Sequence, residues 1–69
     1  MQQFDLEDHE YIELCNLLKL VGITGSGGMA KMLIADGQVT VDGEIELRKR
    51  CKIRSGQVVS CMEETIEVV

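Results

Sequence analysis

The spacing of apolar residues changes from helical in the first half of the chain to alternating in the second half. Over residues 9–21, apolar side chains recur at steps of three and four, which places them on one face of a helix. They are Tyr11, Leu14, Cys15, Leu17, Leu18 and Val21. Asp8 is the predicted N-cap, and Gly22 can adopt the left-handed conformation that ends a helix. The pattern therefore predicts a first helix over residues 9–21, with Tyr11 in the core.

A second, shorter helix is predicted over residues 27–36. Ser26 is its N-cap, because a serine hydroxyl can accept an early backbone N–H, and Gly37 closes it. Its apolar stripe consists of Met29, Ala30, Leu33 and Ile34. Gly27 and Gly28 occupy the first turn, although each costs up to about 1 kcal/mol of helix propensity relative to alanine. Such a choice indicates a close backbone approach, either by a neighbouring element or by a ligand.

The second half of the chain has the alternation and the turn signals of short strands. Asp42-Gly43 between alternating apolar residues favours a hairpin with a two-residue turn, and Ser55-Gly56 is a second turn signal. The predicted strand regions are residues 39–45, 58–59 and 65–69, with a short strand or extended lead-in at residues 2–7. Phe4 is expected to cover the core. The predicted fold class is therefore α+β, with two N-terminal helices packed on a small antiparallel sheet.

Length and composition point to one small domain. With 69 residues, of which 45% are hydrophobic and 28% charged, the chain is predicted to fold as a single domain over residues 1–69. A chain this short has little room for a walled pocket, which weighs against an enzyme and against a small-molecule substrate. No apolar run approaches the roughly 18 residues that span a bilayer, and the first residues lack a signal-peptide pattern. We expect a cytosolic protein without membrane association.

The cysteines and the histidine do not form a recognisable chemical site. Cys15, Cys51 and Cys61 are odd in number and irregularly spaced, so they are predicted to be reduced and mostly buried. His9 precedes Cys15 by six positions, and no second histidine or Cys-x-x-Cys pair completes a metal site. No set of nucleophile, base and orienting group is recognisable either. The expectation is a protein without catalytic residues, metal or cofactor.

Charge is distributed unevenly, with a basic centre and acidic ends. The net charge is −5, yet all seven basic residues fall within residues 19–54, where four acidic residues leave a local charge of +3. Five of the seven lie within residues 48–54, which we call the basic segment. An anionic partner responds to this local field rather than to the total charge. In the alternative, the acidic ends fold over the basic centre and neutralise it.

The basic segment is predicted to be extended. Alternate side chains of a strand face opposite sides, so four cations project from one side while apolar residues pack on the other. The outward set is Arg48, Arg50, Lys52 and Arg54, and the inward set is Leu47, Cys51 and Ile53, with Lys49 breaking the pattern. Outward cations about 6.6 Å apart suit a phosphate backbone. The alternative is a solvated edge strand whose charges prevent sheet-to-sheet pairing.

Residues 12–59 resemble a family of RNA-binding domains named after the fourth protein of the small ribosomal subunit, whose helix-helix-hairpin unit is called the alpha-L motif. The positions that match the family pattern are Ser26, Ala30, Leu33, Ile34, Gly37, Val39, Val41, Asp42 and Gly43. The basic segment and Ser26-Gly27 look most like the small stand-alone bacterial members of the YbcJ type. Gly27 stands where many members carry an arginine, and Lys31 keeps the basic position after the alanine.

The resemblance implies a non-catalytic protein that binds structured RNA, for example ribosomal RNA. Cations and helix N-termini that contact phosphates supply most RNA affinity, and the chain has few aromatic platforms for base stacking. The predicted RNA-binding residues are Lys19, Ser26, Gly27, Gly28, Lys31, Arg48, Lys49, Arg50, Lys52 and Arg54. The alternative function is a protein-interaction adaptor in which the basic segment meets an acidic partner.

Overall fold

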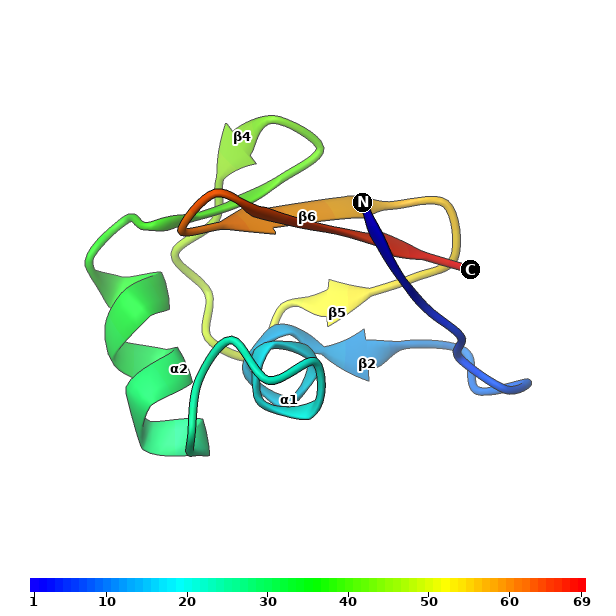
Figure 1. Ribbon diagram of the computed structural model, residues 1–69, viewed down its shortest axis with the longest axis horizontal. Helices are drawn as coiled ribbons and strands as arrows, with labels where there is room; N and C mark the ends of the chain where they lie inside the picture. Colours follow the sequence, from blue (N-terminus) through cyan, green and yellow to red (C-terminus); the bar gives the residue numbers. More distant parts are fainter.

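Two helices and seven short strands form the fold in the computed structural model, which describes residues 1–69 (Figure 1). The helices are α1 (Leu14–Leu20) and α2 (Gly27–Ala35). The strands are β1 (Gln2–Phe4), β2 (Ile12–Glu13), β3 (Val39–Val41), β4 (Glu44–Ile45), β5 (Lys52–Ile53), β6 (Val58–Cys61) and β7 (Glu64–Val68). β2 pairs with β5, and the other five strands form one sheet in the order β1-β7-β6-β3-β4. The predicted α+β class is confirmed.

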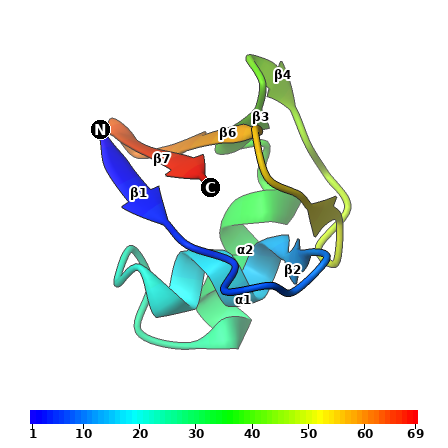
Figure 2. The ribbon, with the colours of Figure 1, turned by 90° about the vertical axis from the view of Figure 1, so that its right-hand side faces the viewer.

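The five-stranded sheet is mixed, so the prediction of a wholly antiparallel sheet is wrong at one strand. β1 runs parallel to β7, with Gln2 opposite Ile66 and Phe4 opposite Val68, whereas the other neighbouring pairs are antiparallel. Parallel neighbours need a long connection, and both helices lie between these two strands in the sequence. Figure 2 shows β1 beside β7, with the helices packed under the sheet. β1 and β4 are the edges, and β7 is paired on both sides.

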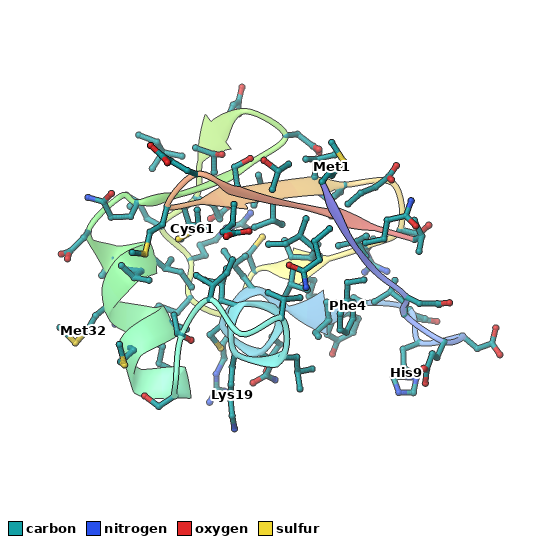
Figure 3. The ribbon with its side chains drawn as sticks, viewed as in Figure 1. Met1, Phe4, His9, Lys19, Met32 and Cys61 are labelled. Carbon is teal, nitrogen blue, oxygen red and sulfur yellow. The ribbon has the colours of Figure 1, made fainter.

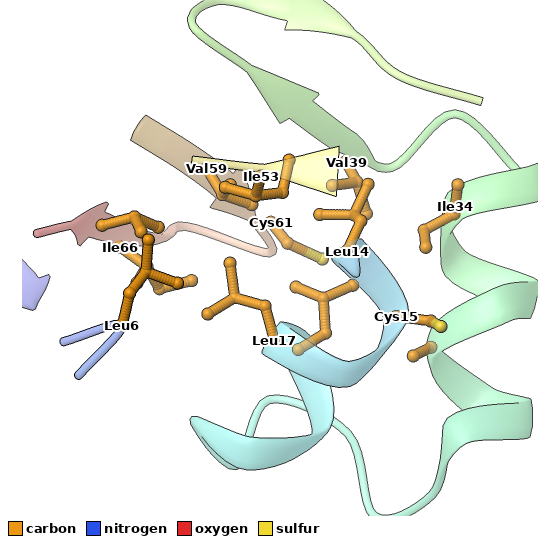
Figure 4. Close-up of a cluster of buried hydrophobic side chains, with 13 residues drawn as sticks. Leu6, Leu14, Cys15, Leu17, Ile34, Val39, Ile53, Val59, Cys61 and Ile66 are labelled. Carbon is orange, nitrogen blue, oxygen red and sulfur yellow. The ribbon is translucent and has the colours of Figure 1, made fainter. Parts of the chain in front are cut away.

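The hydrophobic core lies between the five-stranded sheet and the helices (Figure 4). Its thirteen buried residues are Leu6, Leu14, Cys15, Leu17, Leu18, Ala30, Ile34, Val39, Ile53, Val59, Cys61, Ile66 and Val68. Full burial of one aliphatic side chain of this size stabilises a fold by about 1.5–3 kcal/mol. Phe4 is half-buried against this core, as predicted. Neither helix has the length and apolar character needed to cross a membrane.

α1 is shorter than predicted because residues 12–13 pair as a strand instead of forming its first turn. Asp8 is not the N-cap: its φ is 73°, and it lies in a turn that follows β1. β2 then pairs antiparallel with β5, which requires an extended backbone. The helix begins only at Leu14, and the preceding Glu13 makes no side-chain capping hydrogen bond. The capping partners of this helix must therefore come from elsewhere in the chain.

The second helix and the first hairpin agree with the predictions, except that Met29 of the predicted apolar stripe is 54% exposed. Ser26 caps α2, since its Oγ accepts the backbone N–H of Met29 at 3.2 Å. Gly37, with φ of 77°, follows the end of the helix. Asp42 and Gly43, with φ of 51° and 87°, form the turn between β3 and β4. These features depend on residues close in sequence, which is why local patterns predicted them.

Candidate nucleic-acid interface

The basic segment is held in place by the start of α1. The backbone N–H of Leu14 donates to the carbonyl oxygen of Cys51 at 2.9 Å, and that of Cys15 donates to the carbonyl oxygen of Lys49 at 3.1 Å. The first amides of a helix have no partner within the helix, so these carbonyls provide the missing cap of α1. Because Leu14 is fully buried, the backbone of the basic segment is anchored to a residue of the hydrophobic core.

This anchoring makes the prediction of a continuous extended segment wrong. Residues 49–50 form a turn, and only β5 is paired as a strand. Leu47, predicted to pack inward, is 60% exposed, whereas Ile53 is fully buried and Cys51 half-buried, as predicted. A regular ladder of cations therefore does not exist. The turn is needed because the carbonyls of Lys49 and Cys51 must both reach the amides of α1.

The five cationic side chains nevertheless all lie exposed on the surface. Arg48, Arg50 and Lys52, together with the thiol of Cys51, line one open hollow of about 500 Å³. Burial is the largest cause that raises the pKa of the Cys51 thiol, so at neutral pH the thiol brings no negative charge into this hollow. The hollow can accommodate an anionic group such as phosphate among three cations.

Tyr11 lies beside the basic segment and not in the core, so its predicted position is wrong. Tyr11 is 38% exposed, and the Nζ of Lys52 lies 5.0 Å from the centroid of its ring. The guanidinium carbon of Arg54 lies 5.7 Å from the same centroid. Both distances are within the range of cation–π attraction. Tyr11 thus holds two of the predicted site cations together at one place.

Two of the arginines are paired with carboxylates. The Nε and Nη2 of Arg48 donate to the two carboxylate oxygens of Glu46 at 3.0 and 3.1 Å, and this hydrogen bonding lowers the pKa of Glu46 from 4.5 to about 2. The Nε of Arg50 lies 4.0 Å from Oε2 of Glu13. The other five basic side chains make no ion pair. Of the acidic residues in the two ends, only Glu13 forms an ion pair with the basic segment, whose five cations stay exposed.

The start of α2 is open. A Cβ built on Gly27 would meet no atom within 4 Å, and one on Gly28 would meet only the Oγ of Ser26 at 3.9 Å. Packing against α1 is therefore not the reason for the two glycines. Their backbone N–H groups donate no hydrogen bond within the chain, and the partial positive charge of a helix N-terminus favours an anion there. The hydroxyl of Thr24 donates to the carbonyl oxygen of Ser26 at 3.1 Å and fixes the approach to this turn.

Nine of the ten predicted site residues fall into two groups. One group is the basic segment, where Arg48, Arg50 and Lys52 line one hollow, Lys52 and Arg54 share the Tyr11 ring, and Lys49 lies in the turn at residues 49–50. The other is the start of α2, which comprises Ser26, Gly27 and Gly28, with the half-buried Lys31 one turn further along. Lys19 is exposed on α1 and projects away from the five-stranded sheet (Figure 3). No hydrogen bond or ion pair joins the two groups.

Tyr11, Glu13 and Glu46 are the residues of this surface that the sequence analysis missed. Tyr11 sits at helical spacing from Leu14 and Leu18, so its pattern favoured the core. Only the pairing of β2 with β5 brings its ring to Lys52, and no short-range signal encodes that pairing. Glu46 and Arg48 are two positions apart, and this spacing is compatible with an ion pair. It was the one signal in the sequence from which this pair could have been predicted. Cys15 and Cys61 are buried, as predicted.

The chain belongs to the S4 domain family, whose model matches residues 4–69. This membership agrees with the resemblance noted in the sequence. The matched range includes both groups of candidate residues. The helix-helix-hairpin order of α1, α2 and β3–β4 is the arrangement expected from that resemblance.

Among relatives, the chain is 54% identical to YbcJ of Escherichia coli (strain K12) over 69 residues, which cover 100% of this chain and 99% of that protein. The solution structure of YbcJ, described as revealing an alfaL motif involved in RNA-binding, matches with a TM-score of 0.78 over 100% of this chain and 87% of that one. The probable ribosome maturation protein RlbA of Bacillus subtilis (strain 168) is 40% identical over 52 residues, or 75% and 73% of the two chains.

A more distant structure shows the fold alone. The 30S ribosomal protein S4e from Thermoplasma acidophilum matches with a TM-score of 0.63 at 21% identity, over 84% of this chain and 31% of that one. None of these relatives carries the name of an enzyme.

Proposed function

We propose that this protein is a non-catalytic RNA-binding protein that recognises structured RNA, such as ribosomal RNA, through phosphate and shape contacts. The observation that carries the proposal is the basic segment, whose five exposed cations are fixed to the start of α1 by two backbone hydrogen bonds. Family membership and the RNA-binding motif described for YbcJ support it. The name of RlbA supports a role connected with ribosomes.

Phosphates bind at the basic segment in two ways. Lys49, Lys52 and Arg54 are free of carboxylates and contact phosphates directly. Arg50 first exchanges its longer contact with Glu13 for a phosphate, whereas the two hydrogen bonds from Arg48 to Glu46 keep Arg48 from a phosphate. The Tyr11 ring restricts Lys52 and Arg54 before RNA arrives, so less side-chain entropy is lost on binding. The result is a preformed cationic surface that reads backbone shape.

The start of α2 provides a second phosphate contact. The free N–H groups of Gly27 and Gly28 act as donors, and Lys31 adds charge one turn further along the helix. Lys19 extends the cationic surface on α1. Two contacts on separate elements favour a folded RNA, whose phosphates are fixed relative to one another. The proposed function requires no cofactor.

An NMR titration with RNA tests this function. The 15N-labelled protein is titrated with a ribosomal RNA stem-loop and, separately, with a single strand of the same length. The proposal expects saturable amide shifts at residues 48–54 and at Gly27 and Gly28, with tighter binding of the stem-loop. Absence of saturable shifts contradicts it. Copurification before and after ribonuclease digestion provides the second readout, because a set of protein partners that is unchanged by digestion supports the adaptor instead.

A further inference from the structure

A second candidate surface lies at the turn between β6 and β7 and is lined by no lysine or arginine. Met29 and Met32 of α2 and Met62 of the turn are 54%, 67% and 62% exposed, and they account for three of the four methionines of the chain. With Ile23 and Leu33 they line an almost wholly apolar hollow of about 200 Å³. Figure 3 shows Met32 projecting from α2 into solvent, on the side of the molecule where β6 ends at Cys61.

This hollow continues into a second one. Ile23 and Met62 also line an adjacent hollow of about 320 Å³, whose other walls include Val21 and Glu64. The two hollows therefore form one groove between the α1–α2 connection and the β6–β7 turn, which we call the methionine groove. Methionine side chains are flexible and polarisable, so a groove lined by them can adapt to an apolar partner surface.

The turn that carries Met62 is strained in a way that the other hairpin avoids. Met62 and Glu63 have φ of 51° and 68°, close to the 51° and 87° of Asp42 and Gly43 in the β3–β4 turn. Aspartate and glycine are favoured in such a two-residue turn, whereas methionine and glutamate are not. Met62 is exposed, so core packing does not account for it. The position keeps an apolar side chain at a backbone cost, which indicates a use for that side chain.

The rim of the methionine groove is acidic. Asp36 lines the first hollow and Glu64 the second, and the exposed Glu63 lies between Met62 and Glu64 in the sequence. No lysine or arginine lines either hollow. Such a surface repels a phosphate backbone and attracts cations. The occupant must therefore combine apolar side chains with positive charge.

We propose that the methionine groove docks a basic amphipathic helix of a partner protein. Apolar side chains at positions i, i+3, i+4 and i+7 of that helix enter the groove, where they contact Met29, Met32 and Met62. Lysines or arginines that flank them pair with Asp36, Glu63 and Glu64. This function goes beyond RNA binding, and no lysine or arginine lines the groove that carries it.

A model peptide tests the proposal. The probe is a synthetic helix with leucine at i, i+3, i+4 and i+7 and lysine elsewhere, and the control is a peptide of the same composition in scrambled order. The full chain carries 13C-labelled methionine methyl groups. The proposal expects saturable shifts at Met29, Met32 and Met62 that follow one binding curve, whereas Met1, which is 82% exposed and precedes Gln2 in the wall of the second hollow, shifts less than these three. Equal affinity for the scrambled peptide, or shifts at Met1 only, overturns it.

Variants separate the groove from its alternatives. Met62→Asn combined with Glu63→Gly keeps the turn but removes the apolar contact and one carboxylate of the rim, so peptide affinity falls about tenfold. Lys52→Ala with Arg54→Ala binds the peptide as the unchanged protein does, even if RNA binding fails. Unchanged affinity of the turn variant overturns the proposal. So does a shift of Met62 caused by an RNA stem-loop, since Met62 lies outside the proposed RNA contacts. Concentration-dependent shifts with dimerisation of the protein alone also overturn it and would identify a second copy as occupant.

Discussion

Replacing Glu46 with glutamine is predicted to increase RNA affinity. Glu46 holds Arg48 through two hydrogen bonds to its guanidinium, and its Oε2 also accepts the backbone N–H of Arg48 at 2.9 Å. Glutamine has the same shape and keeps an oxygen for the backbone bond, but it has no charge to retain the guanidinium. The variant therefore frees one cation for phosphate while the backbone of the loop stays in place.

The size of the effect follows from one additional phosphate contact. Each contact adds about 0.7 to 0.9 to the magnitude of the slope of log affinity against log salt. If the two proteins bind equally at about 1 M salt, Glu46→Gln therefore binds about five- to eightfold more tightly than the unchanged protein at about 0.1 M salt. Fluorescence anisotropy with a labelled ribosomal stem-loop between 0.05 and 0.3 M KCl measures both quantities. Glu44→Gln is the matched control, because Glu44 is exposed nearby and pairs with no cation.

Comparison of the two variants tests whether the Arg48–Glu46 pair limits RNA binding. Both remove one negative charge, so both weaken long-range repulsion of RNA to a similar extent. Only Glu46→Gln is expected to steepen the salt dependence. Identical slopes and affinities for the two variants would show that the Arg48–Glu46 pair does not limit RNA binding.

The same ion pair predicts a pH dependence of stability. The folded pKa of Glu46 is lowered to about 2, from 4.5, so the pair stabilises the fold above about pH 4.5, and this contribution is lost as the pH falls towards 2. In urea unfolding, the stability difference between the unchanged protein and Glu46→Gln is therefore expected to shrink over that range. A stability difference that stays constant with pH contradicts the lowered pKa of Glu46 in the folded protein. Gly27→Ala is expected to raise the melting temperature, because its Cβ meets no atom and helix propensity improves by up to about 1 kcal/mol, while RNA affinity falls because the methyl group obstructs the helix start. Unchanged RNA affinity would remove Gly27 from the interface. Tyr11→Leu is expected to weaken RNA binding about two- to fivefold, since an exposed cation–π contact contributes about 0.5–1 kcal/mol; anisotropy measures this, and no loss contradicts the role of the ring. Met62→Asn with Glu63→Gly is expected to raise the melting temperature by at least about 4 °C, because two left-handed residues are replaced by ones that favour that conformation. A lower melting temperature in calorimetry refutes the strain at this turn.

Local signals predicted the parts of the fold that depend on neighbouring residues. Ser26 caps the second helix through a bond to Met29, three residues away, and Asp42-Gly43 form the expected turn. Their geometry needs no information from distant segments. The cap of α2 was accordingly predicted correctly, and its end was predicted within one residue.

The start of α1 and the shape of the basic segment could not be predicted in the same way. Both depend on bonds between Leu14 and Cys51, which are 37 positions apart in the sequence. The composition of the basic segment was visible, but its turn at residues 49–50 follows from capping a distant helix. Tyr11 was misplaced for the same reason. The methionine groove was hidden because Met29 has helical apolar spacing and yet is exposed.

The salt dependence of RNA binding by Arg50→Ala combined with Lys52→Ala tests the central claim most directly. Both side chains line the cationic hollow, and both are exposed, so folding should be nearly unaffected, as circular dichroism can check. Two lost phosphate contacts are expected to weaken binding of a structured RNA and to flatten the log-log slope by about 1.4 to 1.8. If the double variant binds the RNA with unchanged affinity and unchanged slope, the basic segment is not the RNA-binding surface.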